Sequence, residues 1–334
     1  MNMKPVQIGL FVVALVIAAY ALLSGDMLEK EKAAERTPLS IGTNIWPGYE
    51  PLYLARELGY YDNKGIHLVE FASATQVVHA FRNRVILAAA LTLDEVLLLK
   101  DYGLDPKLIL VFDISEGADV IMAKKEITSM AALKGKRIGV ENTALGAFVL
   151  MRALQLNGLN ISDITIVSLP VNEHDSAFDA GKVDALITFE PVRSRLLSKG
   201  YHEIFTSKDM PGEVVDVLVV NKEALISHET QIDSLLQGWF DAVRYFEVRP
   251  DKAARVMAGR QKISVDEVLD SFNGLHIPDI SDNMKMMGRP DALLLGTAER
   301  MAEVMLESKL LKNKLDLESM IVPDPLKRAE NPKQ

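Results

Sequence analysis

Short apolar runs alternate with helical patterns along most of the chain after residue 38. The runs 39–43, 66–71 and 87–91 have the length of strands, and the segments between them, at about 51–58 and 75–83, have helical spacing. Strands separated by helices of this size are typical of βαβ units with parallel sheets. The pattern therefore predicts an α/β fold.

A faint internal repeat divides this pattern into two halves. The matches keep the same order along the chain: Ile41-Gly42 with Ile138-Gly139, Ala80-Phe81 with Ala177-Phe178, and 92–96 with 188–192 after a shift of one residue. Matches in a shared order indicate a shared architecture. We expect two α/β lobes, each opening with strand, loop, helix, strand, helix and strand.

The chain after residue 213 begins with a β-branched strand at 214–220 and continues with three or four helices. Apolar residues at helical spacing predict a stripe that faces the core: Ile232, Leu235, Leu236, Trp239, Phe240, Val243 and Phe246. We expect Trp239 to pack in this core rather than to contact a ligand. Arg249-Pro250-Asp251 is expected to end one helix and to begin the next.

The repeat and the returning strand together predict the domain organisation. If the first lobe resumes after the second, strands near 109–115 and 213–219 cross between them and form a hinge. The prediction is a first lobe at 38–115 and 217–320 and a second lobe at 116–216. The segment 321–334 contains three prolines and many charged residues, and we expect a loose tail there.

The first 25 residues contain an apolar stretch at 8–23, preceded by Lys4 and followed by charged residues. A helix of this length spans about 24 Å, slightly short of a hydrocarbon core of roughly 30 Å. Two interpretations stay open: an uncleaved hydrophobic helix that anchors the chain in the inner membrane, or a signal peptide cleaved after Ala19-Tyr20-Ala21. Both place the remainder, after a linker at 26–37, on the periplasmic side of the cytoplasmic membrane.

Composition excludes several classes of function. Apolar residues make up 49% of the 334 residues, enough for a real core, and the formal net charge of −9 argues against binding nucleic acid or anionic membranes through bulk charge. The chain has no cysteine, which excludes disulfides, thiolate catalysis and cysteine-type zinc sites. The six histidines show no metal-ligand spacing, and no catalytic motif follows a strand. We therefore expect no catalytic residue, no metal and no cofactor, and we expect His174 to lie on the surface.

The loops that follow strands are the candidate binding segments, since ligands of open α/β sheets bind at the carboxyl ends of the strands. The loop 43–51 contains Trp46, Tyr49 and Glu50, which either form a rigid turn or face a ligand. In the second lobe, Asn142 and Thr143 either cap the next helix or hold a polar head group.

The repeat adds a second pair of strand ends, one in each lobe. Thr92 and Asp94 match Thr188 and Glu190. The two carboxylates could act as a general acid and base, could bind an ammonium or amidine-like group, or could merely cap helices. Pro191 fixes the backbone beside Glu190, which favours that residue as a site residue.

Several segments resemble one protein family: IGTNIWPGYEPLYLARELGYY at 41–61, EGAD at 116–119, LKGKRIGV at 133–140 and AFDAGKVDA at 177–185, which runs on to Phe189-Glu190-Pro191. They are similar to the substrate-binding proteins of ABC importers for aliphatic sulfonates, taurine and nitrate, and to binders of thiamine-pyrimidine precursors. The resemblance covers about residues 39–250.

This resemblance implies a type II periplasmic binding fold, in which two lobes joined by a two-strand hinge close around a ligand. It places the loop 46–51, the strand end 92–94, the helix start 142–143, Phe189-Glu190 and Asp216 around the cleft. The sequence departs from the family at 84–87, where Arg-Val-Ile-Leu replaces the Gly-x-x-Asp found at Gly181–Asp184. This departure questions the geometry of that loop.

The leading hypothesis from sequence is therefore a solute-binding protein that works with an ABC permease and ATPase. Because the assigned loops contain no arginine, a zwitterion such as taurine is preferred to a bare anion such as nitrate. The alternatives are an anchored solute sensor without its own transporter and an enzyme of thiamine-pyrimidine synthesis.

Overall fold

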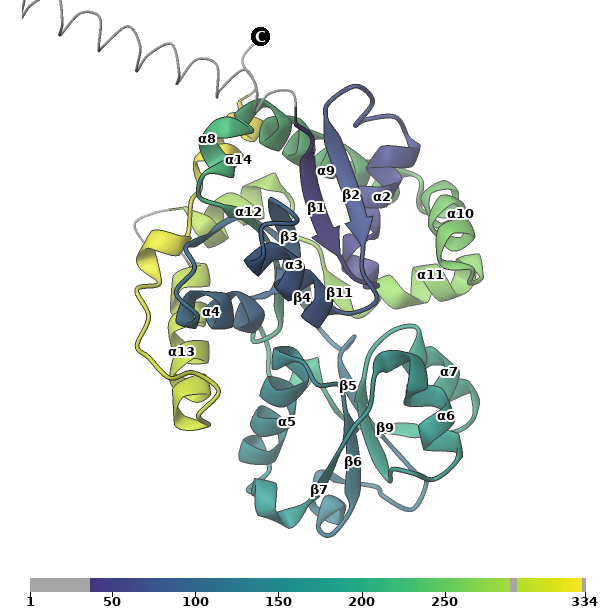
Figure 1. Cartoon of the computed structure of the whole chain (residues 1–334). Helices are drawn as coiled ribbons and strands as arrows, with labels where there is room; N and C mark the ends of the chain where they lie inside the picture. Colours follow the sequence, from purple (N-terminus) through teal and green to yellow (C-terminus); the bar gives the residue numbers. More distant parts are fainter. Residues whose placement is uncertain (1–36, 289–292, 332–334) are drawn as a thin grey trace, which may run out of the picture.

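The computed structural model describes residues 37–288 and 293–331, which form two lobes, each built around one sheet (Figure 1). The strands are β1 (Leu39–Thr43), β2 (Ile66–Glu70), β3 (Ala88–Thr92), β4 (Pro106–Ser115), β5 (Val120–Ala123), β6 (Arg137–Val140), β7 (Thr165–Ser168), β8 (Ala185–Thr188), β9 (His202–Thr206), β10 (Val215–Asn221) and β11 (Leu275–His276). The strands predicted at 39–43, 66–71, 87–91 and 214–220 are confirmed to within one residue at either end, whereas β4 begins three residues before the strand expected near 109–115.

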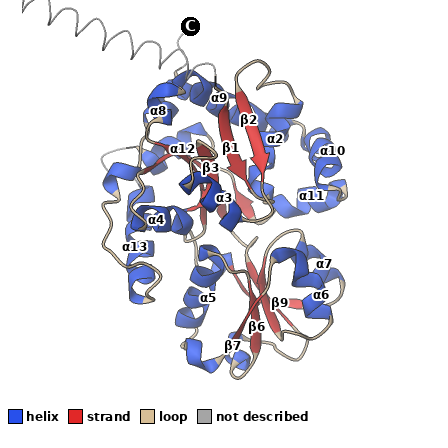
Figure 2. Cartoon of the chain, in the orientation of Figure 1, coloured by secondary structure: helices blue, strands red, loops and turns tan. Residues whose placement is uncertain are grey.

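Helices cover the faces of both sheets (Figure 2). They are α2 (Glu50–Glu57), α3 (Ala74–Arg82), α4 (Leu93–Asp101), α5 (Ala144–Leu156), α6 (His174–Asp179), α7 (Val192–Ser198), α8 (Ala224–Ser227), α9 (Glu229–Val248), α10 (Pro250–Gln261), α11 (Val265–Phe272), α12 (Ile280–Met287), α13 (Leu293–Glu307) and α14 (Asp324–Glu330). Short 3-10 turns add η1 (Pro47–Tyr49), η2 (Met130–Leu133), η3 (Ile161–Asp163), η4 (Val171–Glu173), η5 (Ser207–Asp209) and η6 (Glu318–Met320).

The two sheets share one strand order. The first runs β2-β1-β3-β10-β4-β11 and the second β7-β6-β8-β5-β9. In each, three parallel strands are followed by an antiparallel strand, β10 in the first sheet and β5 in the second. The predicted α/β fold with two similar lobes is confirmed, and β11 is an addition to the first lobe.

The chain crosses between the lobes twice, from β4 to β5 and from β9 to β10. Ser207, in the second crossing, bonds to the first: its Oγ lies 2.8 Å from Ser115 Oγ and accepts from the Gly117 N–H at 2.6 Å. The return comes earlier than the expected boundary at 216, because Val215 and Asp216 already pair with β4. The predicted hinge therefore consists of short segments with a serine hydroxyl between them.

The core of the first lobe contains the predicted stripe of α9. Trp239 is completely buried and packs edge-on against Phe112, with ring centroids 4.7 Å apart. This confirms its packing role. Phe246 is only partly buried, and it packs on Phe272 at 4.5 Å.

The expectation of a loose tail after residue 321 is wrong for the part that the structure describes, which ends at residue 331. Residues 324–330 form α14, Leu326 is completely buried, and the Arg328 guanidinium donates to Asp233 of α9 at 2.9 Å. Burial of one leucine and an ion pair hold this short helix against the first lobe despite the prolines nearby.

The apolar segment 8–23 and nearly all of the linker lie outside the described residues. Within 37–288 and 293–331, no helix combines the length and the apolar character needed to cross a membrane.

The departure at 84–87 leaves the loop geometry unchanged. Arg84 has φ +57°, and Gly181, at the equivalent turn of the second lobe, has φ +67°. The turn in each lobe therefore uses the left-handed conformation, which an arginine adopts at a cost that glycine avoids.

The left-handed conformation of this turn predicts opposite effects on stability for two glycine substitutions. Gly181→Ala should lower the free energy of unfolding by about 1 kcal/mol, because alanine at positive φ is strained. Gly259→Ala is the matched control: Gly259 lies exposed within α10, and a Cβ there would meet no atom within 4 Å. That variant should gain roughly 0.5–1 kcal/mol from helix propensity. Chemical denaturation measures both, and equal effects of the two substitutions would contradict the assignment.

Candidate binding site between the lobes

A cavity with an empty volume of about 400 Å³ lies where the two lobes meet. The first lobe contributes Asn44, Trp46, Tyr49, Ala74, Thr92, Glu95 and Asp216, and the second lobe and the first crossing contribute Asp119, Glu141, Thr143, Leu145 and Phe189. We call this space the inner cavity.

The turn η1 positions two aromatic side chains in this cavity. Pro47 starts the turn with a preset φ. The Trp46 indole N–H donates to Asp113 Oδ2 at 3.1 Å, and the Tyr49 hydroxyl donates to Asp216. Gly48 makes this arrangement possible, because a Cβ there would overlap the Asp113 carboxylate and the Trp46 ring nitrogen.

The end of β3 supplies the second group of lining residues. Thr92 closes the strand, and its N–H donates to Glu95 Oε2 at 3.2 Å in the first turn of α4. The register of β10 sets Asp216 opposite both Thr92 and Asp113. Three neighbouring strands therefore deliver polar groups to one edge of the sheet.

The second lobe closes the cavity from the other side. Thr143 caps α5 by accepting the Gly146 N–H at 3.0 Å, and Phe189 follows β8 directly. The Phe189 ring packs edge-on against Trp46, with centroids 5.6 Å apart, and Thr75 donates to the Asn142 carbonyl at 3.3 Å. The lobes thus touch each other beside the cavity.

Burial raises the pKa of the carboxyl groups around this cavity. It raises the pKa of Glu95 to about 8 and that of Glu141 to about 7. It raises the pKa of Asp119 to about 6, and burial with the nearby Asp113 holds the pKa of Asp216 well above its usual range. Behind the lining, burial raises the pKa of Asp113 to about 8 and that of Asp94 to about 7.

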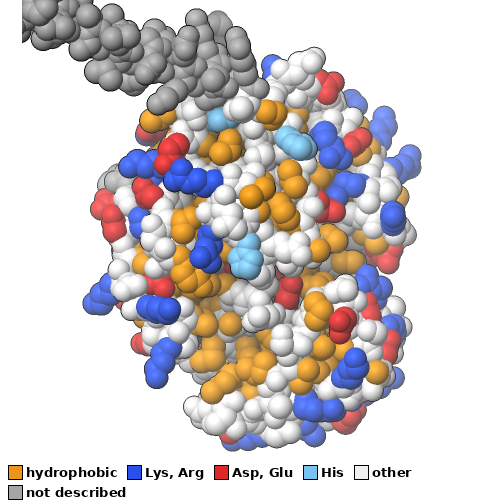
Figure 3. Space-filling view, viewed as in Figure 1, with side chains coloured by type: hydrophobic (Ala, Val, Ile, Leu, Met, Phe, Trp, Pro, Cys, Tyr) orange, Lys and Arg blue, Asp and Glu red, His pale blue; other side chains and the backbone are white. Residues whose placement is uncertain are grey.

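No lysine or arginine is among the lining residues of the inner cavity. On the face seen in Figure 3, basic side chains are scattered and do not gather at the junction of the lobes. Among residues 37–288 and 293–331, the carboxyl groups of the cavity therefore have no cationic partner, and loss of solvation rather than ion pairing sets their titration.

A second, wider space of about 1160 Å³ adjoins the first and shares Asn44, Ala74, Glu141 and Phe189 with it. We call it the outer pocket. It is lined by three basic side chains, Arg195, Arg260 and Lys262, and by Glu70 and Glu190 among others.

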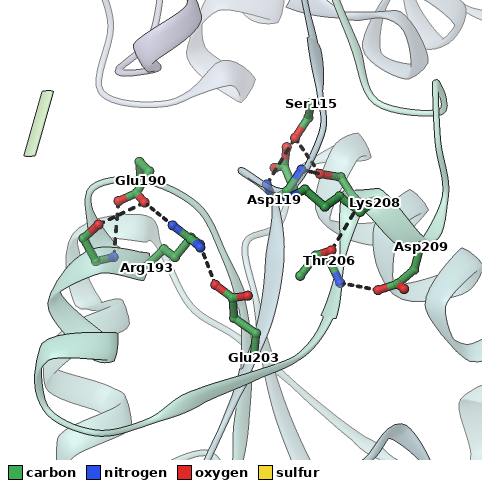
Figure 4. A network of polar contacts seen from close by, with 11 residues as sticks. Ser115, Asp119, Glu190, Arg193, Glu203, Thr206, Lys208 and Asp209 are labelled. Carbon is green, nitrogen blue, oxygen red and sulfur yellow. Dashed lines mark hydrogen bonds and ion pairs between the residues drawn. The ribbon is translucent and has the colours of Figure 1, made fainter. Parts of the chain in front are cut away.

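Two predicted site residues, Glu50 and Glu190, form ion pairs in or beside the outer pocket. Arg260 donates to Glu50 and Glu70 and lies over the Tyr53 ring, 3.9 Å from its centroid. Glu190 accepts from Arg193 at 2.9 Å and from the Ser194 hydroxyl at 3.0 Å. Figure 4 shows the Glu190–Arg193–Glu203 network beside the Ser115–Asp119 network of the first crossing.

The structure brings together six of the ten residues predicted from sequence. Those that line the inner cavity are Trp46, Tyr49, Thr92, Thr143, Phe189 and Asp216. Glu190 lines the outer pocket, and Glu50, Asp94 and Asn142 line neither space. Glu50 is held by Arg260, Asp94 is buried in the first turn of α4, and the exposed Asn142 offers its backbone carbonyl to Thr75.

Sequence reasoning missed Asn44, Glu95, Asp119 and Glu141. Asp119 stood in the family-like segment 116–119, where a crossing was expected, and Glu95 directly follows the predicted Asp94. The expectation of a surface role for His174 is wrong. Its ring is completely buried and bonds to Thr188 Oγ1 at 3.0 Å and to the Leu169 carbonyl at 3.2 Å, which makes it a polar member of the core.

Comparison with known proteins assigns the chain to a family. The model of the NMT1-like family matches residues 32–260. The chain belongs to the NMT1-like family. A protein of Brucella abortus (strain 2308), provisionally named a binding protein, is 22% identical over 212 residues, which cover 62% of this chain and 66% of that protein, just under two thirds.

Solved structures of other proteins share the two-lobed fold of this NMT1-like chain. The periplasmic aliphatic sulphonate-binding protein SsuA of Escherichia coli superimposes with a TM-score of 0.72 at 19% identity, covering 85% of this chain and 92% of that one. The periplasmic nitrate-binding protein NrtA of Synechocystis PCC 6803 gives 0.69 at 14% identity, with 88% of each chain covered. The desulfurization enzyme DSZB gives 0.65 at 18% identity, covering 87% of this chain and 99% of that one. The periplasmic binding protein fold expected from sequence is therefore confirmed.

The buried carboxyls predict how stability depends on pH. An acid whose pKa is higher in the folded state than in the unfolded state contributes its full stabilisation when the pH is below its pKa in the unfolded state. This contribution is lost as the pH rises through its pKa in the folded state. Burial lowers the pKa of His174 and His228. Below about pH 6.5 these two histidines therefore make the free energy of unfolding rise with pH, opposite to the effect of the carboxyls. Between pH 6.5 and 8.5 the carboxyls dominate, so the free energy of unfolding should fall as pH rises.

Glu95→Gln tests this dependence. The variant should reduce the slope by up to about 1.4 kcal/mol per pH unit, the linkage of one proton. Glu116→Gln removes an exposed carboxylate near the same hinge and should keep the slope of the parent. Denaturation at four pH values measures it, and a stability that rises with pH in this window would refute the prediction.

Proposed function

We propose that this chain is the extracytoplasmic solute-binding component of an ABC importer. The observation that carries the proposal is the inner cavity, whose lining comes from both lobes and from the first crossing. A solute held there contacts both lobes at once. It therefore stabilises the closed arrangement in proportion to its preference for it.

The hinge supports this mechanism. The lobes are joined by two short crossings, and they touch at the cavity through the Trp46–Phe189 and Thr75–Asn142 contacts. A rotation about the crossings separates these contacts without disturbing either sheet. Opening then admits the solute, and closing removes water from it.

The likeness to the sulphonate-binding and nitrate-binding proteins supports the same class of function, with delivery to a permease and its ATPase. The apolar segment 8–23 would export the chain and either anchor it in the inner membrane or be removed as a signal peptide. The sulfonate or taurine-like ligand expected from sequence needs qualification. The basic groups that could hold a sulfonate line the outer pocket, so a zwitterion fits the two spaces better than a bare anion does.

Binding rather than catalysis is the role we propose. The desulfurization enzyme DSZB shares the fold, and a cysteine mutant of it has been solved with biphenyl-2-sulfinic acid. The present chain has no cysteine, so it cannot supply a thiol nucleophile.

Closure can be measured directly, because a chain without cysteine accepts labels only where cysteines are introduced. Asn83→Cys in the first lobe and Ser198→Cys in the second are both exposed. A solute that raises the melting temperature should also change energy transfer between dyes at these positions. Full-length protein in mild detergent and a broad panel of sulfonates, amines, nitrate and pyrimidines serve for the measurement.

Trp46→Ala tests whether the inner cavity is responsible. The variant should weaken binding of any solute found in the panel at least tenfold, about 1.4 kcal/mol. Tyr102→Ala, which removes an exposed aromatic ring from the far end of α4, should bind as the parent does. A solute that binds without changing energy transfer, or that ignores Trp46→Ala, would contradict the proposed function.

A further inference from the structure

We infer that the inner cavity binds the protonated nitrogen of an organic amine. This inference deepens the proposed function and rests on it. Four carboxyl groups line the cavity, Glu95 and Asp216 from the first lobe and Asp119 and Glu141 from the second lobe and the crossing that leads into it, and no lysine or arginine lines it. A cation placed among them would pair with carboxyl groups that have no lysine or arginine beside them in the described part of the chain.

A buried carboxylate oxygen in the lining also has no hydrogen-bond donor beside it. This is independent evidence for a ligand that donates hydrogen bonds. Asp119 is only 3% exposed, lines the cavity, and its Oδ2 has no hydrogen-bond partner among the described residues. Buried acceptors of this kind are costly unless a ligand supplies N–H or O–H groups. Sulfonate and nitrate oxygens accept hydrogen bonds and therefore supply none.

The aromatic walls favour an organic cation. Trp46, Tyr49 and Phe189 all line the space, and Trp46 and Phe189 lie edge to face across the two lobes. Aromatic rings attract ammonium groups through their negative faces and also pack on the attached hydrocarbon. A bare metal ion is disfavoured, because no group of three or more His, Asp or Glu side chains within the described part of the chain could hold one.

The outer pocket determines what the rest of the ligand can be. It shares the lining residues Asn44 and Phe189 with the inner cavity, and Lys262 there forms no ion pair with any described residue. An amine whose other end is polar or anionic can therefore extend into it. The amine is the shared requirement, and the second group is variable.

Titration of the cavity supports this assignment. The titratable groups that surround it come from every element packed on it: Tyr49, Asp94, Glu95, Asp113, Asp119, Glu141 and Asp216. Because burial raises the pKa of each carboxyl, some of them hold protons near neutral pH when no cation is present. A bound ammonium lowers these pKa values and drives protons out.

Matched pairs of probes test the inference with the full chain. 1,4-Diaminobutane is compared with 1,4-butanediol, and taurine with ethanesulfonate, by calorimetry in amine-free phosphate buffer. The amine of each pair should bind at least tenfold more tightly than its counterpart. In an unbuffered salt solution under a pH-stat near pH 7.5, amine binding should release protons.

Variants connect this preference to the cavity. Glu95→Gln and Asp119→Asn keep the shape of the side chain, and each should weaken amine binding at least tenfold. Each should also raise the melting temperature of the ligand-free protein at pH 8, since one of several like charges is removed. Glu116→Gln makes the same change in net charge three positions from Asp119 on an exposed side chain, and it should leave both quantities unchanged.

The outcomes separate the two proposals. If ethanesulfonate or nitrate binds and changes energy transfer between the lobes while both amines fail, the inference is wrong and the proposed function stands. If the amines bind with proton release but the lobes do not move, the inference stands and the proposed function fails. If no amine binds at all, or if amine binding is unaffected by Glu95→Gln and Asp119→Asn, the inference is wrong.

Discussion

The insertion of β10 between β3 and β4 is the constraint on which the rest of the structure depends. This strand completes the first sheet only after the chain has built the whole second lobe, so it fixes both crossings and the hinge between them. Its register also sets Asp216 opposite Thr92 and Asp113. The edge of the sheet that faces the second lobe is therefore polar because of strand pairing, before any side chain of the second lobe arrives.

The carboxyl groups at this edge lower the stability of the fold, and they are present because they form the site. Buried acids without cationic partners destabilise a protein, and here they lie on a rigid support. Tyr49 packs on Phe112 with centroids 5.5 Å apart, and Phe112 packs on the buried Trp239 at 4.7 Å. This aromatic column connects the cavity wall to the core helix α9. It holds Tyr49 and its hydrogen bond to Asp216 in place among the buried carboxyl groups.

Periodicity and the internal repeat were enough to predict the two lobes, most element boundaries and the matching strand ends at Thr92 and Thr188. Six site residues followed from their places after strands or from the family resemblance. The misses arose where a local pattern has two physical outcomes. Glu50 and Glu190 look like free carboxylates in the sequence, but Arg260 and Arg193 hold them. Asp119 belongs to a crossing, and its place in the cavity depends on how the lobes close. His174 sits in a polar segment, yet Thr188 and a backbone carbonyl satisfy its ring inside the core.

The Ser207 hydroxyl connects the two crossings of the hinge through hydrogen bonds that can be exchanged. It lies 2.8 Å from the Ser115 hydroxyl and accepts from the Gly117 N–H, and Ser115 in turn accepts the Asp119 N–H at 3.2 Å. A hydroxyl both donates and accepts, and it turns about its C–O bond at little cost. The two crossings can therefore twist past each other by exchanging partners around one oxygen. Rotation at the hinge therefore costs little energy. The contacts at the cavity then determine the energy difference between the open and closed arrangements.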